Sequence, residues 1–269
     1  ESEIDLCEKY LPVCLPGCLQ RYQDIGVIRN RYIQRIFKEL IVSISLTDKR
    51  LLKTGAYING QWQASDDGAT LVVTNPATGE LVARVASCGT AEARRAIEAA
   101  QAAQQGWRQT PIKQRSAILR KWFNLMMENQ EDLAQILTAE QGKPLAEARG
   151  EIAYGASYIE WFAEECKRVY GDTIPHASND KRLVVIKQPV GVVACITPWN
   201  FPNAMLTRKI APALAAGCTV VCKPANATPL SAYAFAELAE RAGVPAGVIN
   251  LVTGRTAEIG KELTSNPIV

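Results

Sequence analysis

Apolar and polar positions follow two different periods along this chain, and the changes of period mark its elements. Residues 57–62, YINGQW, place an Asn-Gly pair between short apolar runs, which is a strong local signal for a hairpin. Residues 71–85, LVVTNPATGELVARV, hold two alternating runs around a second turn. Together the two segments predict a short antiparallel unit.

A helical period follows. Residues 90–107, 113–142 and 144–171 carry apolar side chains at the spacing of one helix face, and the middle range is long enough for one long helix or two. Thr90 is the expected N-cap of the first helix, and Gly142 is the expected end of the second range. Residues 172–191 alternate again around an ASND turn, which predicts an extended arm.

The last part of the chain alternates between buried strands and helices. Strands are expected over 190–196, 219–225 and 247–254, and helices over 202–217, 231–243 and 256–266. This order predicts right-handed crossovers and a Rossmann-like parallel sheet with flanking helices, so the fold class is α/β. Ligands of such sheets bind beyond the carboxyl ends of the strands, here TPWN, CKPAN and TGRTAE.

The charge and composition of the chain give no indication of nucleic-acid binding or of a membrane span. A net charge of +3 with no block of like charges gives no sign of nucleic acid, and no apolar stretch reaches the length of a membrane span. The acidic N-terminus argues against a presequence, so a cytoplasmic setting is expected. Residues 1–48 form an extension with no assigned role, and 49–269 form the expected domain.

Eight cysteines are scattered singly or lie near the N-terminus, which is not the pattern of a secreted disulfide framework. Cys14 and Cys18 have a spacing that could supply half a zinc site, but the chain has a single histidine and no second CxxC. Reduced thiols and no metal are therefore expected.

Two strand ends carry candidate chemistry. In CITPWNFP, Asn200 could be a buried, oriented amide donor that stabilises an oxyanion at a carbonyl carbon, or it could be a loop residue that pairs with nearby backbone. At the end of the next expected strand, Lys223 and Asn226 have no carboxylate beside them, so the position tolerates a 2′-phosphate and favours NADP over NAD. The alternative for Lys223 is a surface lysine. Neither GxGxxG nor a complete P-loop occurs, which excludes the two common phosphate-binding motifs.

Three segments in order, ITPWNFP, TRKIAPALAAGCTVVCKPANATPLSA and AELAERAGVPAGVINLVTG, resemble the aldehyde dehydrogenase superfamily. Residues 140–175, beginning EQGKPLAEARGE, and the TRK at 207–209 resemble its NAD(P)-dependent succinate-semialdehyde branch. The resemblance runs from about residue 57 to the end of the chain and implies an incomplete aldehyde dehydrogenase fold.

The resemblance also implies roles. Asn200 corresponds to the oxyanion donor, and Arg208 becomes a candidate for the distal carboxylate of a semialdehyde, with an incidental surface charge as the alternative. The arm at 172–191 resembles the hairpin that pairs subunits, so a homo-oligomer is expected. The remaining implied residues contact the cofactor, either in its cleft or at the adenosine ribose: Trp199, Asn200, Lys223, Pro224, Ala225 and Asn226.

In the superfamily, the nucleophilic Cys and the general-base Glu follow the segment matched here. Cys195 and Cys222 lie inside apolar strands, where burial makes thiols inert, so neither replaces the nucleophile. The expectation is the cofactor half of an enzyme that oxidises succinate semialdehyde, with the catalytic domain absent and the chain alone inactive. A non-catalytic nucleotide-binding or subunit-docking chain, and an aldehyde dehydrogenase of other specificity, are the alternatives.

Overall fold

The computed structural model describes residues 44–269, which form one packed unit that begins at Ile44. Leu46 is buried in the core, and the amides of Thr47 and Asp48 donate to the Asp132 carboxylate at 2.9 and 2.7 Å. The unit therefore starts before the boundary expected at residue 48. Residues 1–43, with the Cys14–Cys18 pair, lie outside the described range.

A five-stranded sheet lies at the centre of this unit, with the strand order β2-β1-β9-β8-β7. The strands β7 (Val192–Ile196), β8 (Thr219–Lys223) and β9 (Ile249–Leu251) are parallel, as the alternating pattern predicts. The hairpin of β1 (Ala56–Ile58) and β2 (Gln61–Gln63) extends the same sheet, because Tyr57 pairs antiparallel with Leu251. Every residue of β1 is buried, which explains why the hairpin is not a separate unit.

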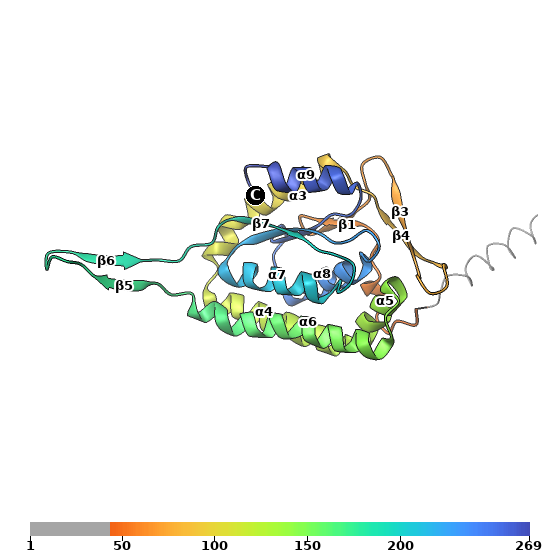
Figure 1. The fold of residues 1–269 in the computed structure, drawn as a ribbon, viewed down its shortest axis with the longest axis horizontal. Helices are drawn as coiled ribbons and strands as arrows, with labels where there is room; N and C mark the ends of the chain where they lie inside the picture. Colours follow the sequence, from red (N-terminus) through yellow and green to blue (C-terminus); the bar gives the residue numbers. More distant parts are fainter. Residues whose placement is uncertain (1–43) are drawn as a thin grey trace, which may run out of the picture. The chain divides into compact units, whose positions relative to one another are not determined.

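Helices cover both faces of the sheet (Figure 1). On one face lie α3 (Thr90–Gln109) and α9 (Thr256–Ser265), and on the other α7 (Ala204–Ala216) and α8 (Leu230–Ala242). An outer layer of α4 (Ile112–Glu128) and α6 (Leu145–Glu165) packs on α7 and α8, with α5 (Gln130–Gln141) beside them. The outer helices matter for function because they contact the start of α7 and the start of α8, the helices that follow β7 and β8.

The helix ends follow the sequence signals with two corrections. Gly142, Gly217 and Gly243 end α5, α7 and α8 with φ of 85°, 91° and 99°, a left-handed conformation that suits glycine. Thr90 is the first residue of α3 and not its N-cap, which is Gly89, and the Gly89 amide donates to the Glu92 carboxylate at 2.9 Å. The helix expected from 202 begins at 204.

Two antiparallel ribbons complete the fold. One pairs β3 (Thr70–Thr74) with β4 (Leu81–Ala86), and the other pairs β5 (Asp172–Pro175) with β6 (Arg182–Val185). The second is the predicted arm, and it projects away from the body with every strand residue exposed (Figure 1). Two single-turn 3-10 helices, Lys49–Leu51 and Cys166–Arg168, precede the first hairpin and the arm. No helix in the described part is both long and apolar enough to cross a membrane.

Candidate functional site

The carboxyl ends of β7, β8 and β9 lie side by side, and the candidate residues extend from them. Ile196 is in register with Lys223, and the Thr197 amide donates to the Lys223 carbonyl at 3.2 Å. Cys222 is in register with Leu251 on the next strand. Residues 197–203, 224–229 and 252–256 therefore meet along one sheet edge, where parallel sheets bind ligands.

Lys223 is buried at this edge, with only 4 % of its surface exposed, so the surface-lysine alternative is wrong. Its Nζ donates to Asn226 Oδ1 at 3.3 Å and to the Pro224 carbonyl at 3.2 Å. Burial lowers the pKa of Lys223, and within residues 44–269 no carboxylate pairs with it. The amine of Lys223 therefore lies beneath the loop without a carboxylate partner among these residues.

Asn226 links this lysine to the end of β9. Its Nδ2 donates to the Gly254 carbonyl at 2.7 Å, and its Oδ1 accepts from the Gly254 amide at 3.3 Å. A second contact joins Nδ2 to Thr256 Oγ1 at 3.3 Å. These bonds fix the side chain between two strand ends, while Pro224 is buried and Ala225 half-buried beside it.

Asn200 is exposed, which corrects the expectation of a buried amide. Its neighbours Trp199 and Phe201 are also open, at 58 % and 45 % exposure. Within the described residues the Asn200 side chain makes no hydrogen bond, so its interpretation as a loop amide that pairs with nearby backbone is wrong as well. The amide is free to bind a ligand.

The loop that carries Asn200 is held from below by two residues that the sequence reasoning missed. Glu151 accepts from the amides of Asn203 and Ala204 at 2.9 and 3.2 Å, and it pairs with Lys143. Lys143 Nζ also donates to the Asn200 carbonyl at 3.2 Å. A signal was present in the sequence, because Glu151 is an acid on the apolar stripe of α6.

A second buried acid supports the loop after β8. Glu140, at the end of α5, accepts from the amides of Leu230 and Ser231 at 2.6 and 2.8 Å, at the start of α8. Burial raises the pKa of Glu140 to about 7, although the same hydrogen bonds favour its ionised form. At the start of each of the two helices that follow β7 and β8, backbone amides thus donate to a buried carboxylate from the outer helices.

Arg208 lies on the exposed side of α7. Its guanidinium carbon is 5.8 Å from the Tyr158 ring centroid, and Nη1 is 3.6 Å from Met205 Sδ. The hydroxyls of Tyr154 and Tyr158 are hydrogen-bonded to each other. No ion pair occupies Arg208 within residues 44–269, and no hydrogen bond there joins it to Asn200. Arg208 is therefore open to an anion, at the edge of an aromatic surface on α6.

A groove of about 700 Å³ runs along that surface of α6. Aromatic and charged side chains line it, including Tyr154, Tyr158, Trp161, Arg120 and Glu164. Because Tyr158 also contacts Arg208, the groove borders the candidate substrate position. Two of these aromatic side chains, Tyr154 and Trp161, are open to solvent, at 49 % and 64 % exposure.

The cysteines of the central strands are buried, as expected. Cys195 and Cys222 are fully covered and adjacent in register, and burial raises the pKa of Cys222 well above its ordinary value. Neither thiol can act as a nucleophile toward a ligand at the sheet edge. Within residues 44–269 no three metal-ligating side chains gather into a site.

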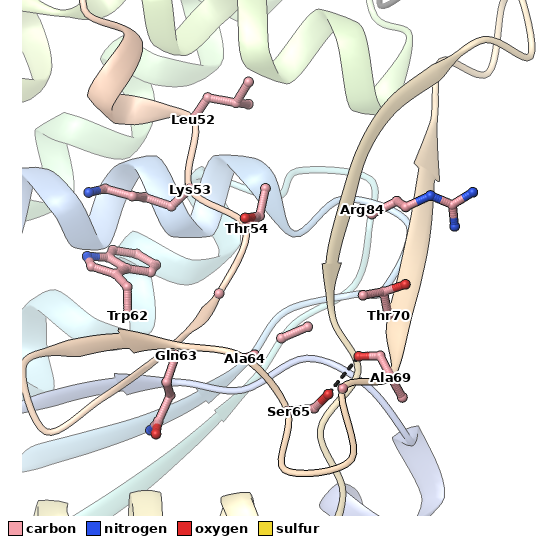
Figure 2. A pocket seen from close by; sticks show the side chains of 13 residues that line it. Leu52, Lys53, Thr54, Trp62, Gln63, Ala64, Ser65, Ala69, Thr70 and Arg84 are labelled. Atoms are coloured by element: carbon pink, nitrogen blue, oxygen red, sulfur yellow. Dashed lines mark hydrogen bonds between the residues drawn. The ribbon is translucent and has the colours of Figure 1, made fainter. Parts of the chain in front are cut away.

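A separate cavity of about 400 Å³ lies between the first hairpin and the β3–β4 ribbon. Figure 2 shows Trp62 and Lys53 on one of its sides and Arg84 directed away from them. Lys53 is occupied by an ion pair with Glu237 at 3.0 Å. None of the residues predicted for the site lines this cavity, so it is distinct from the sheet edge.

Comparison with known proteins agrees with the resemblance seen in the sequence. The aldehyde dehydrogenase family model matches residues 62–269. The glutarate-semialdehyde dehydrogenase of Pseudomonas putida is 64 % identical over 226 residues, which cover 84 % of this chain and 47 % of that enzyme. The NADP(+) succinate-semialdehyde dehydrogenase GabD of Escherichia coli is 61 % identical over 226 residues, with the same coverage.

Solved structures give the same result. A crystal structure described as an E. coli NADP dependent enzyme superposes with a TM-score of 0.83 at 61 % identity, and covers 84 % of this chain and 47 % of that one. A succinate-semialdehyde dehydrogenase from Burkholderia pseudomallei also gives 0.83, at 62 % identity and the same coverage. The chain spans about half the length of these relatives. By sequence and by fold, it belongs to the aldehyde dehydrogenase family.

Proposed function

We propose that this chain is the cofactor-binding half of an NADP-dependent aldehyde dehydrogenase whose substrate is a short aldehyde with a distal anionic group, succinate semialdehyde first among them. The observation that carries the proposal is the buried Lys223 and its partner Asn226 at the strand ends. Such an enzyme oxidises an aldehyde to an acid, and the dinucleotide supplies the hydride acceptor when bound.

The residues present fit a dinucleotide with a 2′-phosphate. Lys223 offers positive charge, and Asn226 stands where an acid would repel the phosphate. The absence of a carboxylate partner for Lys223 within the described residues favours NADP over NAD. Trp199, Pro224 and Ala225 would line the same cleft. The E. coli relative is named as an NADP(+) enzyme, which supports this choice.

Asn200 would act on the aldehyde itself. When a thiolate attacks the carbonyl carbon, negative charge moves to the oxygen, and an amide donor aimed there stabilises the transition state. The exposed and unpaired Asn200 side chain can make that bond. The thiolate and the base for hydrolysis would come from outside this segment, because Cys195 and Cys222 are covered.

Arg208 would select the substrate. A guanidinium binds a carboxylate or a sulfonate through two parallel hydrogen bonds. The named relatives act on aldehydes of this kind: glutarate semialdehyde, succinate semialdehyde and 3-sulfolactaldehyde. Their shared feature is an anion at the far end, which a free arginine beside the groove of α6 would recognise.

Titration of the chain with NADP and NAD by calorimetry tests the cofactor half of the proposal. We expect tighter binding of NADP, and Asn226→Glu should weaken it by at least about tenfold while NAD is affected less. Asn226→Ala is the matched control, because it removes the hydrogen bonds to Gly254 without adding a charge. Tighter binding of NAD by the unmodified chain would contradict the proposal.

Activity can be tested in a chimera in which residues 44–269 replace the matching segment of the E. coli enzyme. We expect NADP-dependent oxidation of succinate semialdehyde. Arg208→Ala should raise KM for succinate semialdehyde by at least about tenfold and leave KM for butyraldehyde unchanged. An equal effect on both aldehydes would remove Arg208 from the substrate site.

A second copy of the chain is the proposed partner, through the arm. On β6, Val184 is 70 % exposed and lies next to Leu183 and Val185, and Ile186, which follows β6, is 68 % exposed. An exposed strand edge with apolar side chains pairs readily with another strand. Self-association would cover this surface.

A further inference from the structure

Lys143 occupies a position from which it can hold the loop of Asn200 in place. It follows Gly142 at the end of α5, and only 10 % of its side chain is exposed. We propose that Lys143, together with Glu151, is a positioning residue that fixes Asn200 for the aldehyde. This inference rests on the proposed role of Asn200 as the oxyanion donor.

Glu151 is bonded to the start of α7 and holds Lys143 in place. Its Oε1 accepts from the amides of Asn203 and Ala204 at 2.9 and 3.2 Å, at the start of α7. Its Oε2 pairs with Lys143 Nζ at 2.5 Å, and only 1 % of its side chain is exposed. Two backbone amides and one ammonium group therefore satisfy a carboxylate that is otherwise out of contact with water.

Lys143 joins Glu151 to the loop that carries Asn200. Its Nζ donates to the Asn200 carbonyl at 3.2 Å and lies 4.2 Å from the Phe201 ring centroid. The loop is fixed at its two ends, because Thr197 is hydrogen-bonded to β8 and Asn203 is hydrogen-bonded to Glu151. Between these ends, within the described residues, the Lys143 ammonium group is the side chain that donates a hydrogen bond to the loop. Without it, the peptide of Asn200 loses a charge-assisted hydrogen bond.

The same contacts show that Lys143 acts through Asn200 and does not bind substrate. Its ammonium group is directed at Glu151, at the Asn200 carbonyl and at the face of Phe201. A residue covered on these sides has no direct access to an aldehyde. Since a misplacement of about 1 Å can cost about a hundredfold in rate, a loosened loop would still lower turnover.

Hydrogen exchange of the chain itself tests the structural part. We expect Lys143→Met to raise the exchange rate of amides 198–204 by at least about tenfold, with no change in β9 or α9. Lys121→Met, at an exposed position of α4, is the control and should change neither region. If Lys143→Met does not fold, Phe201→Leu removes only the ring contact and should raise the same rates by at least about threefold. Unchanged exchange in the folded variant would overturn the inference.

Kinetics of the chimera tests the functional part. We expect Lys143→Met to lower kcat by about 10- to 100-fold and to leave KM for NADP within about twofold. In an Asn200→Ala background, Lys143→Met should cause little further loss, because it acts through the missing amide. Multiplied losses in the double variant would overturn the inference. If Asn200→Ala alone keeps full kcat, the oxyanion role fails, whereas the exchange result still decides whether Lys143 holds the loop.

Discussion

The close contact between α6 and α7 gives a prediction that can be worked out in detail. Gly155 of α6 faces the start of α7, and a Cβ at this position would lie 2.2 Å from Asn203 Oδ1 and 3.1 Å from Thr207 Oγ1. Asn203 is buried, and its side-chain amide has no hydrogen-bond partner within the described residues. Gly155→Ala therefore forces Asn203 to move in a packed interior.

Two opposing effects set the size of the change. Alanine is favoured over glycine inside a helix by about 1 kcal/mol, whereas an added methyl group in a packed core costs about 1–3 kcal/mol. Gly150 lies in the same helix, and a Cβ there meets nothing within 4 Å. Gly150→Ala should gain only the stability that comes from the higher helix propensity of alanine. Gly155→Ala should therefore be about 1–3 kcal/mol less stable than this control.

Thermal unfolding followed by circular dichroism measures the difference. For a unit of this size, 1 kcal/mol shifts Tm by about 2–4 °C, so Gly155→Ala should melt about 2–12 °C below Gly150→Ala. Hydrogen exchange should rise at residues 200–206 in the first variant only. Equal melting temperatures would refute the reasoning, because they would mean that Asn203 has room to turn aside.

Three other predictions follow from burial and exposure. The pKa of Glu140 is about 7 in the folded chain and 4.5 ordinarily, so between these pH values the folded chain keeps a proton that the unfolded chain has released. The free energy of unfolding, relative to that of Glu140→Gln, should therefore be greatest below pH 4.5 and fall by about 3 kcal/mol as the pH rises to about 7. Urea unfolding at a series of pH values measures this change. Iodoacetamide at pH 8 should leave Cys195 and Cys222 unlabelled until the chain unfolds, as peptide mapping would show, because both thiols are covered. Val184→Lys should weaken self-association, measured by analytical ultracentrifugation. The control Asn179→Lys, at the exposed turn of the arm, adds the same charge and should not weaken it. An unmodified chain that is monomeric at every concentration would contradict the role of the arm.

Local sequence signals were sufficient for most of the fold. The alternation of strands and helices from residue 190 onward determined the parallel order, and glycines such as Gly217 marked the helix ends. The place of the first hairpin was not predictable in this way. Tyr57 pairs with Leu251, far away in the sequence, and no local pattern encodes such a contact.

The candidate site shows the same division. Position at or just after the end of a strand made Lys223, Asn226 and Asn200 candidates, because strand ends follow from periodicity. Burial was less predictable: Lys223 is covered and Asn200 is exposed, which reverses the expectation for Asn200 and excludes the surface alternative for Lys223. Exposure depends on which segments lie above a loop, and that is a property of tertiary packing.

The segment EQGKPLAEARGE, residues 140–151, has a physical role in the structure beyond its resemblance to a family sequence. Its first residue, Glu140, accepts hydrogen bonds from the start of α8, and its last, Glu151, accepts them from the start of α7. Lys143 lies between them and reaches the Asn200 carbonyl. The helices that follow β7 and β8 are thus both anchored from the outer helices. The anchoring groups come from one short stretch, so that stretch contacts both the loop that carries Asn200 and the start of the helix that follows the loop of Asn226.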